Sequence, residues 1–214
     1  MVEVNGLIHP GIGTLARLQD TPEQHTTRLS KIESAARTIL ECIGEDPTRP
    51  GLLDTPARFA KAIMTFTEGY SQDIQTVTNG AIFDEHRSGM VSVKDIDISS
   101  LCEHHLVPFI GKIHIGYIPN GSIIGLSKLA RIANMFSQRL QVQERLTEEV
   151  ADTIMEVLKP QGVAVMVEAS HMCMVMRGVN KTAAVTVTSC FRGCFETNDK
   201  TRNEFFALVG AGRR

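Results

Sequence analysis

Hydrophobic residues in the first part of the chain recur at the three-to-four-residue spacing of amphipathic helices. One predicted helix runs over residues 26–43. Its apolar stripe consists of Leu29, Ile32, Ala36, Ile39, Leu40 and Ile43. A second helix begins at Thr55-Pro56, where a cap residue precedes a proline, and ends near Gly69. Its inward side chains are expected to be Phe59, Ile63 and Phe66.

After residue 90 the spacing of apolar residues changes to two, which is typical of β-strands. Alternation runs from Val91 to Ile98, and a phase slip near Asp95 predicts a β-bulge. Further strands are expected at 113–117, 163–177 and 185–187, and further helices at 127–136, 142–158 and 199–209. This order of elements favours an α+β fold with an antiparallel sheet.

These patterns divide the chain into three predicted parts. Residues 1–25 show no period and are expected to form a flexible N-terminal arm. Residues 26–90 form a helical region whose last part, 70–90, is expected to be a connecting loop. Residues 91–214 contain the sheet and its helices.

Composition narrows the class of protein. The 214 residues carry 22 basic and 24 acidic side chains, so the net charge is −2, which disfavours a general nucleic-acid binder. No apolar run approaches the ~20 residues of a membrane helix, and the first residues do not resemble a secretory signal. Five scattered cysteines make a poor disulfide framework and fit a reducing compartment. We expect a cytoplasmic, enzyme-sized domain.

The densest group of metal-binding residue types is Cys102-Glu103-His104-His105. Cys102 and His105 are separated by two residues, which is a chelating spacing for zinc. A second group is His171-Met172-Cys173, followed by Arg177. If the strand at 163–177 is regular, His171, Cys173 and Arg177 project from one face.

Cys102, His105 and Cys173 would supply two thiolates and one imidazole, a set that suits Zn2+ and leaves a fourth position for water. Spacing alone leaves a closed structural site open as the alternative, with His104 or His171 as the fourth ligand. In the open site, His104 and His171 are either proton-transfer groups or packing residues. His9, His25, His86 and His114 are expected at the surface or in loops, and Cys190 with Cys194 is a disfavoured metal pair.

The helix predicted at 127–136 begins with a candidate anion site. Ser127 is a suitable cap, and Lys128 and Arg131 lie on neighbouring parts of one helical face. Cations beside exposed N–H groups attract phosphate, although most such side chains are merely solvated. Arg58 and Arg177 are further candidate cations.

Glu144 stands beside Gln143 at the start of the next predicted helix. A carboxylate there is favoured by the helix dipole, and it could equally accept the two adjacent donors of a guanine edge. The sequence does not choose between these explanations.

Four separated motifs occur together in one order along the chain. They are Cys102-Glu103-His104-His105, residues 124–128 (IGLSK), residues 141–145 (QVQER), and His171-Met172-Cys173 with Arg177-Gly178. Together they resemble GTP cyclohydrolase I over about residues 30–209. The resemblance implies N-terminal helices followed by a tunnelling (T-fold) catalytic domain at 91–214. It further implies a homodecamer with active sites between subunits.

The activity implied by the resemblance is the conversion of GTP and water to 7,8-dihydroneopterin triphosphate and formate. This is the first step of pterin biosynthesis, leading to folate and one-carbon metabolism or to tetrahydrobiopterin. By resemblance, Cys102, His105 and Cys173 hold zinc, whose water attacks guanine C8, and His104 and His171 transfer protons. Glu144 holds the guanine and Gln143 helps to orient the substrate. The triphosphate and ribose would be bound by Ser127, Lys128, Arg131, Arg177 and Arg58.

The same residues argue against several other functions. A non-catalytic or regulatory T-fold protein that binds a pterin or purine should have lost a ligand or a spare histidine, and none is missing. A pterin synthase with three histidine ligands and a nitrile reductase with a thiol nucleophile fit the Cys-Cys-His set poorly. A zinc nucleoside deaminase should carry Pro-Cys-x-x-Cys, which is absent. A feedback regulatory protein is a partner that the resemblance allows.

Overall fold

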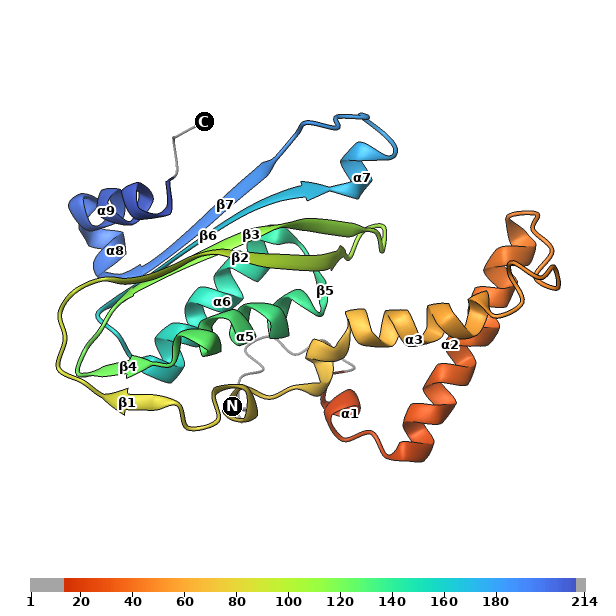
Figure 1. Cartoon of the computed structure of the whole chain (residues 1–214), viewed down its shortest axis with the longest axis horizontal. Helices are drawn as coiled ribbons and strands as arrows, with labels where there is room; N and C mark the ends of the chain where they lie inside the picture. The colour runs from red at the N-terminus through yellow and green to blue at the C-terminus, as the bar shows by residue number, and fades with distance from the viewer. Residues whose placement is uncertain (1–13, 211–214) are drawn as a thin grey trace.

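The computed structural model describes residues 14–210, so most of the predicted arm, residues 1–13, lies outside the described residues (Figure 1). A short helix, α1 (Thr14–Leu18), precedes the long helix α2 (Pro22–Cys42). Thr21 caps α2, because its hydroxyl accepts from the N–H of Gln24 while the Gln24 side chain accepts from the N–H of Thr21. This capping box starts the helix at Pro22, earlier than the predicted Thr26.

The predicted inward faces of the first two helices are confirmed only in part: Ala36 is buried, and Leu29, Ile32, Leu40 and Ile63 are half-buried. α2 buries only Ala36, whereas Ile39 and Ile43 are 54% and 69% exposed. α3 (Thr55–Phe66) buries Pro56, Ala60 and Met64, and leaves Phe59 and Phe66 about half exposed. The two helices pack on each other and project away from the sheet, so much of their apolar surface has no cover among residues 14–210 (Figure 1).

The segment predicted as a loop at 70–90 contains regular structure. A 3-10 turn, η1 (Glu68–Ser71), leads to α4 (Ile74–Thr78), which Asp73 caps by accepting from the N–H of Thr76. The residues that follow form β1 (Ile82–Asp84), which pairs with β4 (Ser122–Ile124). Its pairing partner is 40 residues away in sequence, so local spacing did not predict this strand.

The main sheet has the strand order β5-β2-β3-β6-β7. Its strands are β2 (Val91–Cys102), β3 (Pro108–Ile118), β5 (Leu140–Gln141), β6 (Gly162–His171) and β7 (Thr186–Gly193). All neighbours are antiparallel except β5, which runs parallel to β2. The predicted bulge is confirmed by a register shift between Val93 and Ile96, with Asp95 in the left-handed region at φ 59°. The expected α+β class with an antiparallel sheet is confirmed.

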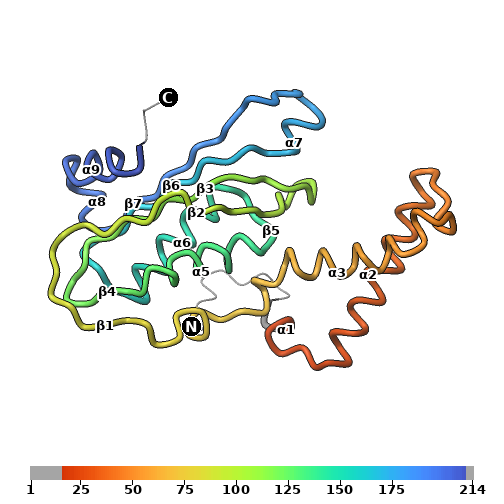
Figure 2. The backbone as a smooth tube through the Cα atoms, viewed as in Figure 1, coloured from red at the N-terminus to blue at the C-terminus, as the bar shows by residue number. Residues whose placement is uncertain are grey.

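Two layers of helices cover the sheet. α5 (Leu126–Ser137) and α6 (Gln143–Leu158) pack on one face, and α8 (Cys194–Thr197) with α9 (Asp199–Val209) packs beside the opposite face (Figure 2). The main core between the sheet and α5 and α6 includes the fully buried Phe136, Leu146 and Ile113. The N-cap of α5 is Gly125, so the prediction of Ser127 as the cap is wrong.

The long strand predicted at 163–177 ends at His171. Residues Met172–Val175 form the short helix α7, so the expected alternation of His171, Cys173 and Arg177 on one strand face is wrong. Every helix in the described part of the chain is too short or too polar to cross a membrane.

His114 lies on β3 and is 4% exposed, which corrects its expected surface position. Its Nδ1 accepts from the N–H of Asp95 in the bulge at 3.1 Å. Burial lowers the pKa of His114 below 6.5; the charges of Asp95 and Glu168 oppose this shift, and those of Lys112 and Lys94 add to it. Protonation of Nδ1 would abolish the bond to the bulge.

We expect the protein to lose stability as pH falls from about 7 through the folded-state pKa of His114. The unfolded histidine, with a pKa near ~6.5, binds the proton more readily, so acid favours the unfolded state. The loss should be about 1 kcal/mol, the net value of one hydrogen bond. Melting temperature measured against pH checks this expectation. His114→Asn, which can still accept from Asp95 but does not titrate, should lack this component; an identical pH profile in that variant would contradict it.

Candidate active site

Three metal-binding side chains converge at the end of the sheet. One ligand atom each from Cys102, His105 and Cys173 lies within 4.8 Å of the others. Cys102 ends β2, His105 follows it in a tight turn, and Cys173 comes from α7. The turn is closed by the N–H groups of His105 and Leu106, which both donate to the carbonyl of Cys102. Cys173 thus belongs to the predicted cluster, although it lies on a helix and not on the strand that the spacing predicted.

The turn that carries Cys102 and His105 is hydrogen-bonded to strand β5 and to helix α6. The N–H of Glu103 donates to the carbonyl of Gln141 on β5 at 3.0 Å. The Glu103 carboxylate accepts both ends of the Arg145 guanidinium, at 2.7 and 3.0 Å. This two-point pair lowers the pKa of Glu103 and joins the turn to α6. Sequence reasoning missed it, because the partners are 42 residues apart.

The cluster is suited to a cation. Burial raises the pKa of the Cys173 thiol, and the nearby Cys102 raises it further, while Arg177 lowers it. Two sulfurs and one imidazole nitrogen form a soft donor set that favours a metal such as zinc over magnesium or calcium. Arg177 lies at the edge of this group, with its Nη1 2.5 Å from His105 Nε2.

His171 is held beside the cluster on two sides. Its ring stacks on Phe109, with centroids 4.7 Å apart and planes 10° from parallel. Its Nε2 lies 2.8 Å from Oε1 of Gln143. Burial lowers the pKa of His171, and the Glu144 carboxylate opposes this shift. His104 is exposed, with Nδ1 3.9 Å from the Cys102 sulfur.

The two residues predicted to orient the guanine are placed differently. Glu144 is exposed in the first turn of α6, where its carboxylate acts electrostatically on His171. Gln143 is 1% exposed and lies behind His171, with its amide bonded to β6 and β7. Direct contact between Gln143 and a substrate stays a prediction. In the structure, Gln143 contacts His171, whose Nε2 lies 2.8 Å from its Oε1.

The three predicted phosphate-binding residues on α5 are Ser127, Lys128 and Arg131, and the beginning of this helix lies away from the cluster. Ser127 is exposed in the first turn of α5 and Arg131 is exposed near its middle, whereas the end of this helix leads into β5 beside Cys102. The two ends of a 12-residue helix are about 18 Å apart. Lys128 is buried and donates to the carbonyl of Val77 at 3.2 Å.

Arg58 is also away from the cluster. It lies on α3, which packs mainly on α2, and its guanidinium pairs with Asp54 at 2.9 Å. Arg177 is therefore the one predicted phosphate-binding cation that the described part of the chain places beside the cluster.

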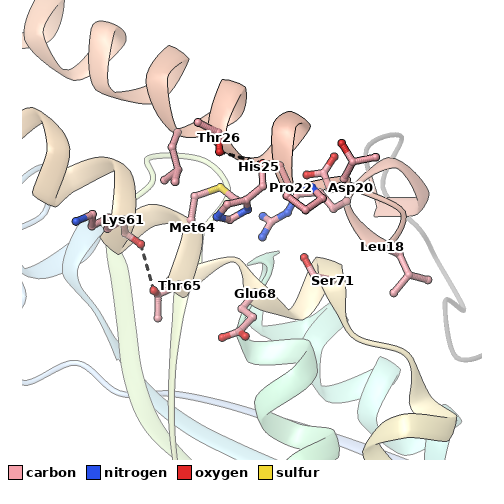
Figure 3. A pocket seen from close by; sticks show the side chains of 13 residues that line it. Leu18, Asp20, Pro22, His25, Thr26, Lys61, Met64, Thr65, Glu68 and Ser71 are labelled. Atoms are coloured by element: carbon pink, nitrogen blue, oxygen red, sulfur yellow. Dashed lines mark hydrogen bonds between the residues drawn. The ribbon is translucent and has the colours of Figure 1, made fainter.

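A cavity of about 780 Å³ opens elsewhere, between α1, α2, α3 and η1 (Figure 3). Charged side chains of both signs line it, among them Arg17, Asp20, Lys61 and Glu68. None of the predicted site residues is among its 13 lining residues. The convergent donor set lies outside this cavity, at the end of the sheet.

Comparison with known proteins identifies the family of the chain. Residues 32–210 match the family model described as GTP cyclohydrolase I. Proteins named GTP cyclohydrolase 1 match with 58% identity in Neurospora crassa (100% of this chain, 68% of that protein) and 55% in Saccharomyces cerevisiae (98% and 86%). The human protein of that name is 53% identical over 94% of this chain and 80% of its own length.

Proposed function

The chain belongs to the GTP cyclohydrolase I family and is an enzyme of that kind with the family's T-fold, and from this premise we propose its reaction. The proposed reaction is the zinc-dependent conversion of GTP and water to 7,8-dihydroneopterin triphosphate and formate. The observation that carries it is the convergence of Cys102, His105 and Cys173 within 4.8 Å, beside a second histidine, His171.

The residues present fit a catalytic zinc ion. Cys102, His105 and Cys173 would hold it with three protein ligands, the number typical of catalytic zinc sites. When bound, zinc would lower the pKa of a coordinated water enough to make hydroxide available near neutral pH. The raised pKa of Cys173 is consistent with a thiol that needs a cation beside it to remain ionised.

The remaining roles fall to side chains of the chain itself. His171, stacked on Phe109 and bonded to Gln143, would exchange a proton with the guanine ring. His104, exposed beside Cys102, would serve the second proton transfer and ribose opening. The exposed Glu144 carboxylate would accept hydrogen bonds from the two adjacent donors of the guanine edge, and the Arg177 guanidinium would bind the phosphates.

We propose that a second copy of the chain completes the site. The metal cluster lies at one end of the sheet, while Ser127 and Lys128 lie at the far end of α5 and Arg131 lies near the middle of that helix. The apolar faces left open on α2 and α3 support assembly, because exposed patches of this kind mark interfaces. We propose a ring-shaped homodecamer in which the helical region 26–90 and the catalytic domain 91–214 both contribute contacts between subunits. Such an assembly agrees with the separation of the metal cluster from the phosphate-binding residues of α5.

Mixed assemblies should test the shared site. Co-expression of His171→Ala with Arg131→Ala chains should restore activity that neither variant has alone. Random mixing would leave about one quarter of the sites with both intact halves. Formate release by the mixed assembly, compared with each parent, measures this recovery. If the two halves belonged to one chain, the mixture would be no more active than its parents.

The reaction itself is tested by measuring formate and pterin release from GTP, with and without a zinc chelator. Release of both products that stops with the chelator and returns with added zinc would support the proposal. Zinc and GTP binding without formate would favour the alternative, a non-catalytic or regulatory T-fold protein that binds a pterin or purine.

The five cysteines are free, which supports the proposed cytoplasmic location.

A further inference from the structure

The side-chain amide of Gln143 has an orientation set by its surroundings. Its Nε2 lies 3.0 Å from the carbonyl oxygen of Val167, 3.0 Å from that of Thr186, and 3.1 Å from Oγ1 of Thr188. A carbonyl oxygen only accepts hydrogen bonds, so the Gln143 atom between two carbonyls must be the nitrogen. Because the residue is 1% exposed, bulk water offers no alternative partner.

The hydroxyl groups around Gln143 agree with this orientation. Thr147 Oγ1 donates to the main-chain carbonyl of Gln143 at 2.7 Å. Its oxygen can then accept the proton of Thr188 Oγ1, which is 2.7 Å away. With its proton used in this way, the Thr188 oxygen can only accept from Gln143 Nε2, whose two protons are shared among three acceptors, Thr188 Oγ1 and the carbonyls of Val167 and Thr186. A flipped amide would place oxygen against oxygen at two carbonyls, which leaves buried groups unsatisfied.

This orientation determines which nitrogen of His171 carries the proton. Oε1 of Gln143 faces His171 Nε2 at 2.8 Å and can only accept, so Nε2 donates. In a neutral imidazole the other nitrogen, Nδ1, is then unprotonated. The stack on Phe109 holds the ring in this plane.

We propose that Gln143 is a positioning residue that keeps neutral His171 protonated at Nε2 and presents Nδ1 as the proton-accepting atom. This inference rests on the proposed proton-transfer role of His171. It needs no contact between Gln143 and GTP, in contrast to the role implied by resemblance. Without Gln143 both tautomers and more than one ring position become populated, so only a fraction of the molecules would be competent.

The test compares the zinc-loaded wild-type enzyme with Gln143→Met, which keeps the side-chain length but has no amide. Solid-state 15N NMR of protein labelled at the histidine ring nitrogens reports the tautomer, and His171→Asn identifies the His171 signals. We expect Nε2 protonated and Nδ1 bare in the wild type, and a mixture in Gln143→Met. The kcat should fall about 10–100-fold, while the KM for GTP changes less than about two-fold and zinc is retained.

Gln141→Met is the matched control, because Gln141 is also 1% exposed and its amide donates to Phe136 and Glu149. It should lower the melting temperature without changing the His171 tautomer. Wild-type protein protonated at Nδ1 would overturn the inference, as would a Gln143→Met variant that keeps the wild-type kcat. If the wild type released no formate, the proposed function would fail, and the wild-type spectrum alone would still decide the tautomer.

Discussion

Replacing Cys173 with serine is expected to remove the metal from the protein and to abolish formate release. The substitution takes one sulfur from a cluster of three donors, and a neutral hydroxyl is a poor replacement for a thiolate toward zinc. Zinc should fall from about one ion per chain to a small fraction after dialysis against a weak chelator. Activity should fall by at least ~10²-fold, since the bound ion supplies the nucleophile.

The experiment uses elemental analysis of the purified variant together with the formate assay. Cys194→Ser is a suitable control, because Cys194 is also half-buried and lies outside the cluster. The control should keep its zinc. Unchanged zinc content in Cys173→Ser would remove Cys173 from the ligand set and with it the three-ligand site.

Replacing His171 with alanine is expected to leave zinc in place and to stop turnover. His171 lies beside the cluster but is bonded to Gln143 and stacked on Phe109, so its removal leaves all three proposed ligands. Loss of a general acid or base lowers kcat by typically ~10²–10⁴-fold. Steady-state kinetics with GTP and elemental analysis on the same preparation measure the two effects separately.

His25→Ala controls for the loss of a histidine, because His25 is exposed in α2. This variant should retain both zinc and kcat. Loss of zinc from His171→Ala would instead make His171 a fourth ligand and the site a closed, structural one. Full activity with zinc retained would leave His104 as the proton-transfer group and remove His171 from the mechanism.

The elements with strong local signals were predicted well. The helix at 142–158 is observed as α6, the helix at 199–209 as α9, and the bulge near Asp95 as a register shift. Each depends on spacing or turn chemistry within a few residues. Cys102, His105 and Cys173 were also grouped correctly, although Cys173 lies on a helix that the pattern did not show.

Other features depended on partners distant in sequence. Local period marks a helix as amphipathic but does not say which neighbour covers it, so Phe59 and Phe66 were assigned to a core that the described part of the chain does not provide. For the same reason β1 was missed, since its pairing partner β4 lies 40 residues on. His114 was assigned to the surface because residue type alone does not reveal burial in a central strand.

By itself, the sequence determined the elements with a strong period, the family motifs and the donor types for a metal, because these depend on residue identity and short spacing. Only the tertiary structure decided that Gln143 lies behind His171, that Glu103 pairs with Arg145, and that Ser127 lies a helix length from the cluster. Hydrogen bonds and distances of this kind arise when the sheet brings together segments that are far apart along the chain. The sequence therefore predicted the types of metal-binding residue at the end of the sheet, but it did not predict their geometry.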